Sequence, residues 1–137
     1  MSAFFPDVNV LLAFAWDSHA EHLRVRSWLM GVSQFSTSPI TELGFMRMSM
    51  SPAYAATFQD AISVLEALHQ LKSASKIHDD FDAVQIPEVT RYKDTTDAYL
   101  VKLAEAHGLR FATLDQGILN ADWSSKIAIN PLTSGST

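Results

Sequence analysis

Apolar segments alternate with capping and turn residues along the chain, and this pattern predicts short strands separated by helices. The predicted strands are a segment ending at Phe5 and residues 34–37, 83–86, 109–114 and 126–129. The predicted helices are residues 8–16, 19–30 and 39–50, a helix that begins after Thr57, and a helix from about residue 96 to Gly108. Strands and helices that alternate at these lengths predict an α/β fold, in which helices cover both faces of a parallel sheet.

Capping signals set the expected start of three helices. Ser18 and Glu21 have the spacing of a capping box, which starts the second helix. Ser38 followed by Pro39 is a helix-start signal, with serine as the cap and proline at the first helical position. Thr57 caps the next helix. That helix has an apolar stripe that we expect in the core, formed by Phe58, Ile62, Leu65 and Leu68.

The 137 residues fit one compact domain, because 47% of them are hydrophobic and can form a sizeable core. We expect this domain to cover residues 1 to about 132, followed by a disordered tail, 133–137. The chain has no cysteine, which excludes disulfides, thiolate catalysis and cysteine-bound zinc. No basic export signal is visible, and the longest apolar run, residues 10–16, is too short to span a membrane. The expected location is therefore the cytoplasm.

Ten Lys and Arg residues against fifteen Asp and Glu residues give a net charge of −5. Such a charge normally disfavours a nucleic-acid partner, because nucleic acids are bound by basic surfaces. If some of the carboxylates bind divalent cations, however, the metal supplies the positive field that a phosphate group requires. An acidic chain can therefore still act on RNA.

Four acidic residues occupy positions from which they can converge. Asp7 and Asp115 each follow a predicted strand directly, whereas Glu42 and Asp97 lie near the start of predicted helices. In open α/β sheets the ligand crevice lies beyond the carboxyl ends of the strands, where the strand order reverses. Clustered carboxylates repel one another, and a divalent cation removes that cost. Oxygen ligands favour Mg²⁺ or Mn²⁺, which can orient water for phosphodiester hydrolysis.

Spacing alone leaves a second interpretation open, because acidic residues at helix N-termini also act as caps or interact with the helix dipole. Four segments, however, together resemble the PIN-domain ribonucleases of the VapC toxin type. They are residues 7–12 (DVNVLL), 41–47 (TELGFMR), 96–100 (TDAYL) and 113–117 (TLDQG). The resemblance spans nearly the whole chain. It implies a three-layer α/β/α sandwich around a parallel sheet of four to five strands.

The resemblance also implies an activity and partners. The expected activity is Mg²⁺- or Mn²⁺-dependent cleavage of RNA, with transfer RNA as the first target to consider. The expected partners are a second copy of the chain, as a homodimer, and a cognate antitoxin. The metal-binding catalytic residues would be Asp7, Glu42, Asp97 and Asp115. Asp94 competes with Asp97 for its role, but only Asp97 is followed by the Ala-Tyr-Leu that the family shows.

Other polar residues are candidates for supporting roles. Asn9 would orient the Asp7 carboxylate and the Thr113 hydroxyl would bond near Asp115, although both also fit ordinary turn and strand-end positions. Four basic residues are candidates for binding RNA phosphate, although such residues are usually solvated surface: Arg47, Arg91, Lys93 and Lys102.

No histidine is needed for this chemistry. His19 and His22 have a metal-binding spacing on a helix but no third ligand nearby, so we expect them to be exposed to solvent. His69 and His78 have no evident partners. His107 precedes Gly108 and is suited to a helix C-terminus.

Three alternatives compete with a ribonuclease. A phosphate-accepting receiver domain has a similar length and fold, but it requires an acidic pair after the first strand, whereas Val8 and Asn9 follow Asp7. Its mid-chain acid would have to follow a strand, yet Asp60 caps a helix. A haloacid-type phosphatase requires aspartate in place of Asn9. A PIN-fold protein that binds RNA or an antitoxin without cleavage is disfavoured only by the presence of all four acids.

Overall fold

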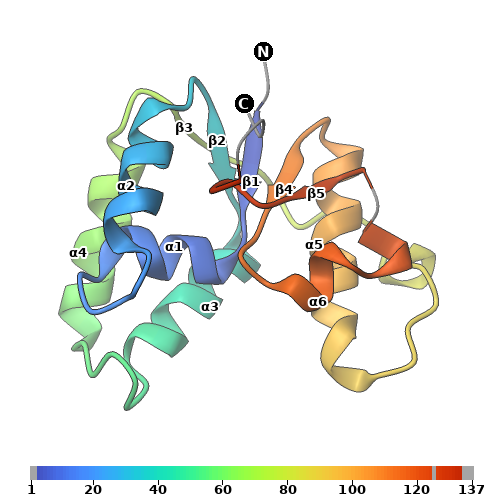
Figure 1. Ribbon diagram of the computed structural model, residues 1–137, viewed down its shortest axis with the longest axis horizontal. Coiled ribbons are helices and arrows are strands. Elements are labelled where there is room, and N and C mark those ends of the chain that lie inside the picture. The colour runs from blue at the N-terminus through green and yellow to red at the C-terminus, as the bar shows by residue number, and fades with distance from the viewer. Residues whose placement is uncertain (1–2, 125, 134–137) are drawn as a thin grey trace.

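The computed structural model describes residues 3–124 and 126–133, and a sheet of five parallel strands lies at its centre (Figure 1). The strands are β1 (Phe4–Pro6), β2 (Phe35–Thr37), β3 (Ala74–Lys76), β4 (Arg110–Ala112) and β5 (Ala128–Ile129). Their order across the sheet is β3-β2-β1-β4-β5. The chain therefore builds one side of the sheet from β1 to β3 and then crosses β1 to build the other side.

Helices cover both faces of this sheet, which confirms the predicted three-layer sandwich. One face packs against α1 (Val8–Ala15), α2 (His22–Gly31), α3 (Pro39–Ser49) and α4 (Phe58–His69), and the other packs against α5 (Thr95–Ala106) and α6 (Gln116–Leu119) (Figure 1). Short 3₁₀ helices lie in the connections: η1 (Ala83–Gln85), η2 (Tyr92–Asp94) and η3 (Asp122–Ser124).

β1 separates two hydrophobic cores, because successive side chains of a strand point to opposite faces of the sheet. Phe4 packs against Trp28 of α2, with ring centroids 5.0 Å apart. Phe5 belongs to the other core, where its ring lies 6.0 Å from that of Phe111 in β4. All three residues of β1 are buried. Packing on both faces therefore holds this strand in the middle of the sheet and fixes where it ends.

The strand order reverses between β1 and β4. Their register pairs Phe5 with Phe111 and Pro6 with Ala112. The backbone N–H of Asp7 donates to the carbonyl of Ala112 at 2.8 Å, which extends the pairing by one residue. Asp7 and Thr113, the first residues after the two strands, consequently lie at the same edge of the sheet. This edge is where parallel sheets of this kind bind ligands.

The contact between α1 and α3 is unusually close. A methyl group added at Gly44 of α3 would lie only 2.7 Å from the Cγ2 atom of Val8 in α1. Glycine at this position therefore lets the two helices approach each other. The packing of these helices sets one wall of the crevice described below.

The second helix begins later than the capping signal predicts. α2 starts at His22, and its N-cap is Glu21, which makes no side-chain capping hydrogen bond. Ser18 lies in a turn, where the backbone N–H of His19 donates to Trp16 and that of His22 donates to His19. Because these bonds turn the chain before the helix begins, the predicted capping box is wrong.

The predicted strand at residues 83–86 is also wrong, and β3 lies earlier in the chain. Residues Ala83–Gln85 form η1, whose Val84 is 86% exposed and donates its N–H to Asp82. β3 has the sequence Ala-Ser-Lys and lies at the edge of the sheet, so it shows no apolar alternation. Phe58, expected in the core, is 51% exposed because it is the first residue of α4.

Two further expectations concern the ends of the chain and the membrane. Residues 1, 2 and 134–137 lie outside the described residues, so most of the expected tail lies there too. Thr133 is described, and its hydroxyl donates to the carbonyl of Asn130 at 2.9 Å. In residues 3–124 and 126–133, no helix is long and apolar enough to cross a membrane.

Candidate active site

Asp7 leaves β1 at the carboxyl edge of the sheet and caps α1. Its Oδ1 atom accepts the backbone N–H of Val8 at 2.7 Å, and its Oδ2 atom accepts the hydroxyl of Thr113 at 2.8 Å. The residue is only 6% exposed. Burial raises the pKa of the Asp7 carboxyl to about 6, although the hydrogen bonds from Thr113 and Val8 act in the opposite direction. The negative charge of Asp115 raises this pKa further.

Thr113 connects the ends of β1 and β4. Its Oγ1 atom accepts the backbone N–H of Asp115 at 3.1 Å and the side-chain amide of Asn9 at 3.4 Å. A hydroxyl has one proton, so this proton is directed at Asp7. The Oδ1 atom of Asn9 in turn accepts the backbone N–H of Leu114 at 3.3 Å. Thr113 thus fixes the orientation of the Asp7 carboxylate. Asn9 supports this orientation indirectly, because it bonds to Thr113 and not to Asp7.

Asp115 follows β4 and is the N-cap of the short helix α6. Its Oδ1 atom accepts the backbone N–H groups of Gly117 at 2.7 Å and Ile118 at 3.3 Å. A methyl group added at Gly117 would lie 3.0 Å from the same oxygen. These contacts fix one oxygen of the carboxylate. The residue is exposed, so its other oxygen can face a ligand.

Asp97 lies in the first turn of α5, on the opposite side of the crevice from α1. Burial raises the pKa of its carboxyl to about 7, and the charges of Asp7, Asp115 and Asp94 contribute in that order. Among the described residues, no N–H or hydroxyl donates to this carboxylate. The raised pKa means that burial and the neighbouring aspartates both disfavour the charged form of Asp97 when no cation is present. Asp94, the competing candidate, lies 3.6 Å from Arg91 in an ion pair and lines a different pocket.

A cleft of about 670 Å³ brings three of the four predicted acids together. Its polar lining residues are Asp7, Asn9, Arg47, Lys93, Thr96, Asp97 and Asp115. Apolar residues of α1, α3 and α5 form the remaining walls: Val8, Leu12, Ile40, Leu43, Gly44, Met48 and Leu100. Thr96 lies in a segment that carries the family resemblance but was assigned no role, and no charge pattern indicates the apolar part of the wall formed by α3.

Glu42 does not join the other three acids. Its Oε2 atom accepts the hydroxyl of Thr37 at 2.6 Å and lies 2.8 Å from the Nε2 atom of His69. The residues of α3 that line the cleft are Ile40, Leu43, Gly44, Arg47 and Met48. At 3.6 residues per turn, Glu42 lies on the other side of this helix. The expectation that His69 has no partner is therefore wrong, and the four-acid cluster is reduced to three in the structure.

The structure places only some of the candidate RNA-binding residues at the cleft. Arg47 and Lys93 line the cleft with the aspartates. Lys102 instead lies 3.0 Å from Glu105 in an ion pair within α5, and it does not line the cleft. Of these three residues, only Arg47 and Lys93 can meet a phosphate group that lies against the acids.

The donor chemistry of the cleft fits a hard divalent cation. Asp7, Asp97 and Asp115 line it and supply carboxylate oxygens, while burial raises the pKa of Asp7 and of Asp97 and neighbouring carboxylates add to the effect. Within the described part of the chain, no three His, Cys, Asp or Glu side chains lie close enough together to enclose an ion. Mg²⁺ needs no such enclosure, because it keeps several waters and binds through one or two carboxylates and substrate phosphate.

Comparisons with known proteins identify the family of the chain. A family model described as "PIN domain" matches residues 4–124. Ribonuclease VapC38 of Mycobacterium tuberculosis is 39% identical over 119 residues, which cover 82% of this chain and 84% of the relative. Ribonuclease VapC44 of the same species is 35% identical over 125 residues, covering 82% and 85%. Ribonuclease VapC39 is 30% identical over 125 residues, covering 84% and 90%. Match length and identity together establish that the chain belongs to the PIN-domain family.

Proposed function

We propose that the chain is a metal-dependent endoribonuclease that hydrolyses phosphodiester bonds in RNA. The observation that carries this proposal is the convergence of Asp7, Asp97 and Asp115 on one cleft, with the pKa of Asp7 at about 6 and that of Asp97 at about 7. Burial and a neighbouring carboxylate both disfavour the charged forms of Asp7 and Asp97, and a bound cation offsets this cost. The similarity to mycobacterial ribonucleases of the VapC type supports RNA as the substrate.

Asp7, Asp97 and Asp115 would hold Mg²⁺ or Mn²⁺, which supplies charge stabilisation at the phosphate and lowers the pKa of bound water. Glu42 is not included, because its carboxylate is occupied by Thr37 and His69. Thr113 keeps Asp7 in one orientation through the 2.8 Å hydrogen bond to its Oδ2 atom. Hydrogen bonds of this kind orient a metal-binding carboxylate and support its affinity for the ion.

Proton transfer and phosphate binding are assigned to individual residues of the cleft. The pKa of Asp97, about 7, is higher than that of Asp7, about 6, which favours Asp97 over Asp7 as the group that accepts a proton from the attacking water. Arg47 and Lys93 line the same cleft and bind the phosphates that flank the scissile bond. These two cations also offset the net charge of −5 where the RNA approaches.

The biological role that we propose is that of a toxin, whose activity is held in check by a small cognate antitoxin. The homodimer implied by the family resemblance belongs to the same proposal, and so does transfer RNA as the first substrate to test. Expression of the chain alone should slow bacterial growth, and co-expression of a small antitoxin encoded next to it should restore growth. Growth at the normal rate would count against the toxin role but not against the nuclease.

The test of the nuclease is cleavage of structured RNA by the purified chain. Cleavage should require Mg²⁺ or Mn²⁺, stop in excess chelator, and stop in the Asp97→Asn and Asp7→Asn variants. Asp17→Asn is the matched control, because Asp17 is an exposed aspartate outside the cleft. Full activity in chelator would overturn the proposal. Binding of RNA without cleavage at any metal concentration would favour the non-catalytic alternative instead.

A further inference from the structure

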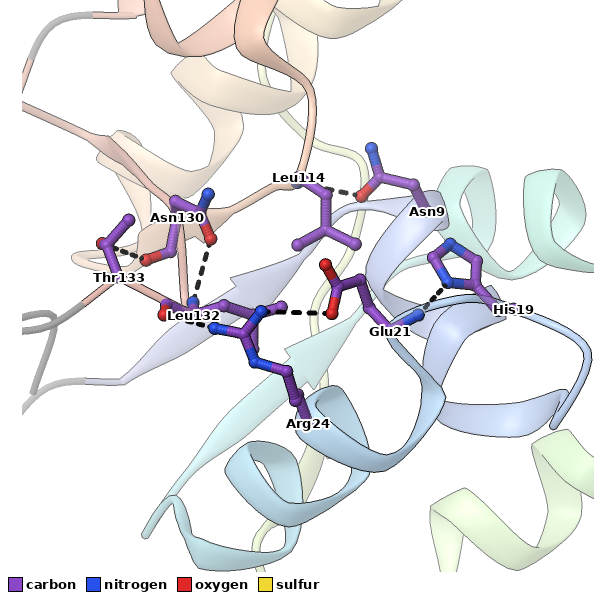
Figure 2. Close-up of a pocket in the computed structure, with 8 residues that line it drawn as sticks. All are labelled: Asn9, His19, Glu21, Arg24, Leu114, Asn130, Leu132 and Thr133. Atoms are coloured by element: carbon purple, nitrogen blue, oxygen red, sulfur yellow. Dashed lines mark hydrogen bonds and ion pairs between the residues drawn. The ribbon is translucent and has the colours of Figure 1, made fainter.

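A second pocket adjoins the cleft and contains none of the three aspartates. Its volume is about 430 Å³, within the range of about 300–1,000 Å³ that is usual for small-molecule sites. Figure 2 shows its lining: Asn9, His19, Glu21, Arg24, Leu114, Asn130, Leu132 and Thr133. These residues come from α1, from the start of α2, from the end of β4 and from the segment after β5. Neither the cleft chemistry nor the family resemblance assigns it a role.

Asn9 joins this pocket to the cleft, since its side chain lines both. Its Oδ1 atom accepts the N–H of Leu114 in the pocket wall (Figure 2). Its amide donates to the hydroxyl oxygen of Thr113, which in turn donates to Asp7. Leu114 directly precedes Asp115 in the chain. A group bound in the pocket therefore lies next to a phosphodiester bound over the aspartates.

The pocket has hydrogen-bonding groups that the fold does not use. The Nδ1 atom of His19 accepts the N–H of Glu21 at 3.0 Å, so the neutral ring has its proton on Nε2. The Oδ1 atom of Asn130 accepts the N–H of Leu132 at 2.9 Å, which leaves its amide as a donor. Glu21 binds Arg24 through Oε1 at 3.2 Å, which leaves Oε2 as an acceptor. Contacts among the described residues occupy none of these three remaining groups.

Arg24 adds a flat surface to these groups. Its NH1 atom binds Glu21, and its NH2 atom donates to the carbonyl of Leu132 at 3.1 Å (Figure 2). Two partners fix the plane of the guanidinium. A fixed guanidinium plane is a surface on which unpaired nucleobases stack, while donors and acceptors beside it bind the base edge.

We propose that this pocket binds one nucleobase of the RNA strand, adjacent to the bond that is cut. The inference rests on the proposed function, because it takes RNA as the ligand of the cleft. A neutral base fits the pocket better than a phosphate group does, since the charges of Arg24 and Glu21 cancel and Glu21 repels anions. The pocket thus gives the enzyme a preference for the base at one position of its target.

The test measures binding to single-stranded RNA hexamers of A, C, G or U by the full chain in excess chelator, where cleavage does not occur. One base should bind about tenfold more tightly than the weakest, which is about 1.4 kcal/mol. His19→Asn keeps an acceptor for Glu21 but removes the Nε2 donor, and Arg24→Lys keeps the charge but removes the plane. Both variants should reduce the discrimination below about threefold. His78→Asn and Arg110→Lys are the matched controls, since neither residue lines the pocket.

Nuclear magnetic resonance of the same samples locates the base. The amide signals of Glu21, Leu132 and the Asn130 side chain should shift with the preferred hexamer. Shifts confined to the cleft, equal shifts with inorganic phosphate, or unchanged discrimination in both variants would overturn the pocket assignment. Cleavage with Mn²⁺ is measured separately. Its absence would overturn the proposed nuclease, whereas the hexamer binding alone decides whether the pocket recognises a base.

Discussion

The hydroxyl of Thr113 donates to the Oδ2 atom of Asp7 at 2.8 Å, across 106 positions of the chain. This bond joins the first residues after β1 and β4, and it orients the most deeply buried acid of the cleft. Because it stabilises the charged form of Asp7, it partly opposes the effect of burial on that group's pKa.

Thr113→Val should therefore weaken metal binding and activity by roughly 10- to 100-fold, the range found when a group that orients a metal ligand is removed. The reason is that Asp7 loses one of its two hydrogen-bond donors while it stays buried, so its pKa rises above about 6. Titration calorimetry with Mn²⁺ measures the first effect and RNA cleavage measures the second. Thr113→Ser keeps the hydroxyl and should retain most of both, and equal losses in the two variants would contradict this account.

Activity should rise steeply between pH 5 and pH 8. Both Asp7 and Asp97 must be ionised to hold a cation, and their pKa values without metal are about 6 and about 7. More metal should move the profile to lower pH, because the cation favours the charged carboxylates. Initial rates of RNA cleavage at two Mn²⁺ concentrations provide the measurement. A profile that is flat across this range would mean that the two carboxylates do not control the reaction.

Stability without metal should show the opposite pH dependence. The folded chain has an Asp97 pKa of about 7 against an ordinary value of 3.8, so it binds a proton that the unfolded chain releases between these values. The free energy of unfolding should fall as the pH rises from about 4 to 7. Asp97→Asn should raise the Tm in chelator at pH 8 by a few degrees, since 1 kcal/mol corresponds to roughly 4 °C in a domain of this size.

The pH dependence of the Tm of the same two proteins provides the control for this effect. The Tm difference between the Asp97→Asn variant and the unsubstituted chain should shrink as the pH falls towards 4, where both chains are neutral at this position. Added Mn²⁺ should stabilise only the unsubstituted chain. A Tm difference that does not change with pH would assign the effect to packing.

Glu42→Gln should lower the stability of the chain while leaving metal affinity within about threefold of normal. The carboxylate is half-buried and bonded to Thr37 and His69, so its loss should cost about 1–2 kcal/mol of unfolding free energy. Urea unfolding and Mn²⁺ titration measure the two quantities. A loss of metal affinity as large as that of Asp97→Asn would instead return Glu42 to the metal-binding group.

Arg47→Gln and Lys93→Gln should each weaken RNA binding and make it less sensitive to salt. Each removed phosphate contact should reduce the slope of log affinity against log salt by roughly 0.7 for single-stranded RNA. Lys102→Gln is the matched control, because that residue pairs with Glu105 outside the cleft. Filter binding over a range of KCl concentrations provides the slopes. A larger effect from Lys102 than from Arg47 would mean that the RNA follows another path.

The sequence predicted the parts of the site that depend on strand ends. Asp7 and Asp115 follow apolar segments, and the carboxyl ends of neighbouring parallel strands meet at one edge. Asp97 was predicted from its position near the start of a helix. Glu42 had the same signal, but the rotation of α3 about its axis depends on which of its faces packs against α1, and the close contact of Gly44 with Val8 decides this.

The parts of the fold that could not be predicted have little apolar content of their own. β3 is Ala-Ser-Lys, and only its backbone pairing with β2 makes it a strand. Residues 83–86 are apolar enough to resemble a strand, yet Val84 faces solvent. The contact between His69 and Glu42 could not be predicted, because Glu42 lies 27 positions earlier, on another helix.

The pairing of β1 with β4 has a consequence for the synthesis of the chain. Asp7 emerges from the ribosome early, but Thr113 and Asp115 emerge more than a hundred residues later. Contacts of such high sequence separation form late in folding. An incomplete chain that ends before Thr113 therefore cannot assemble the proposed site, which can form only once the chain is nearly full length.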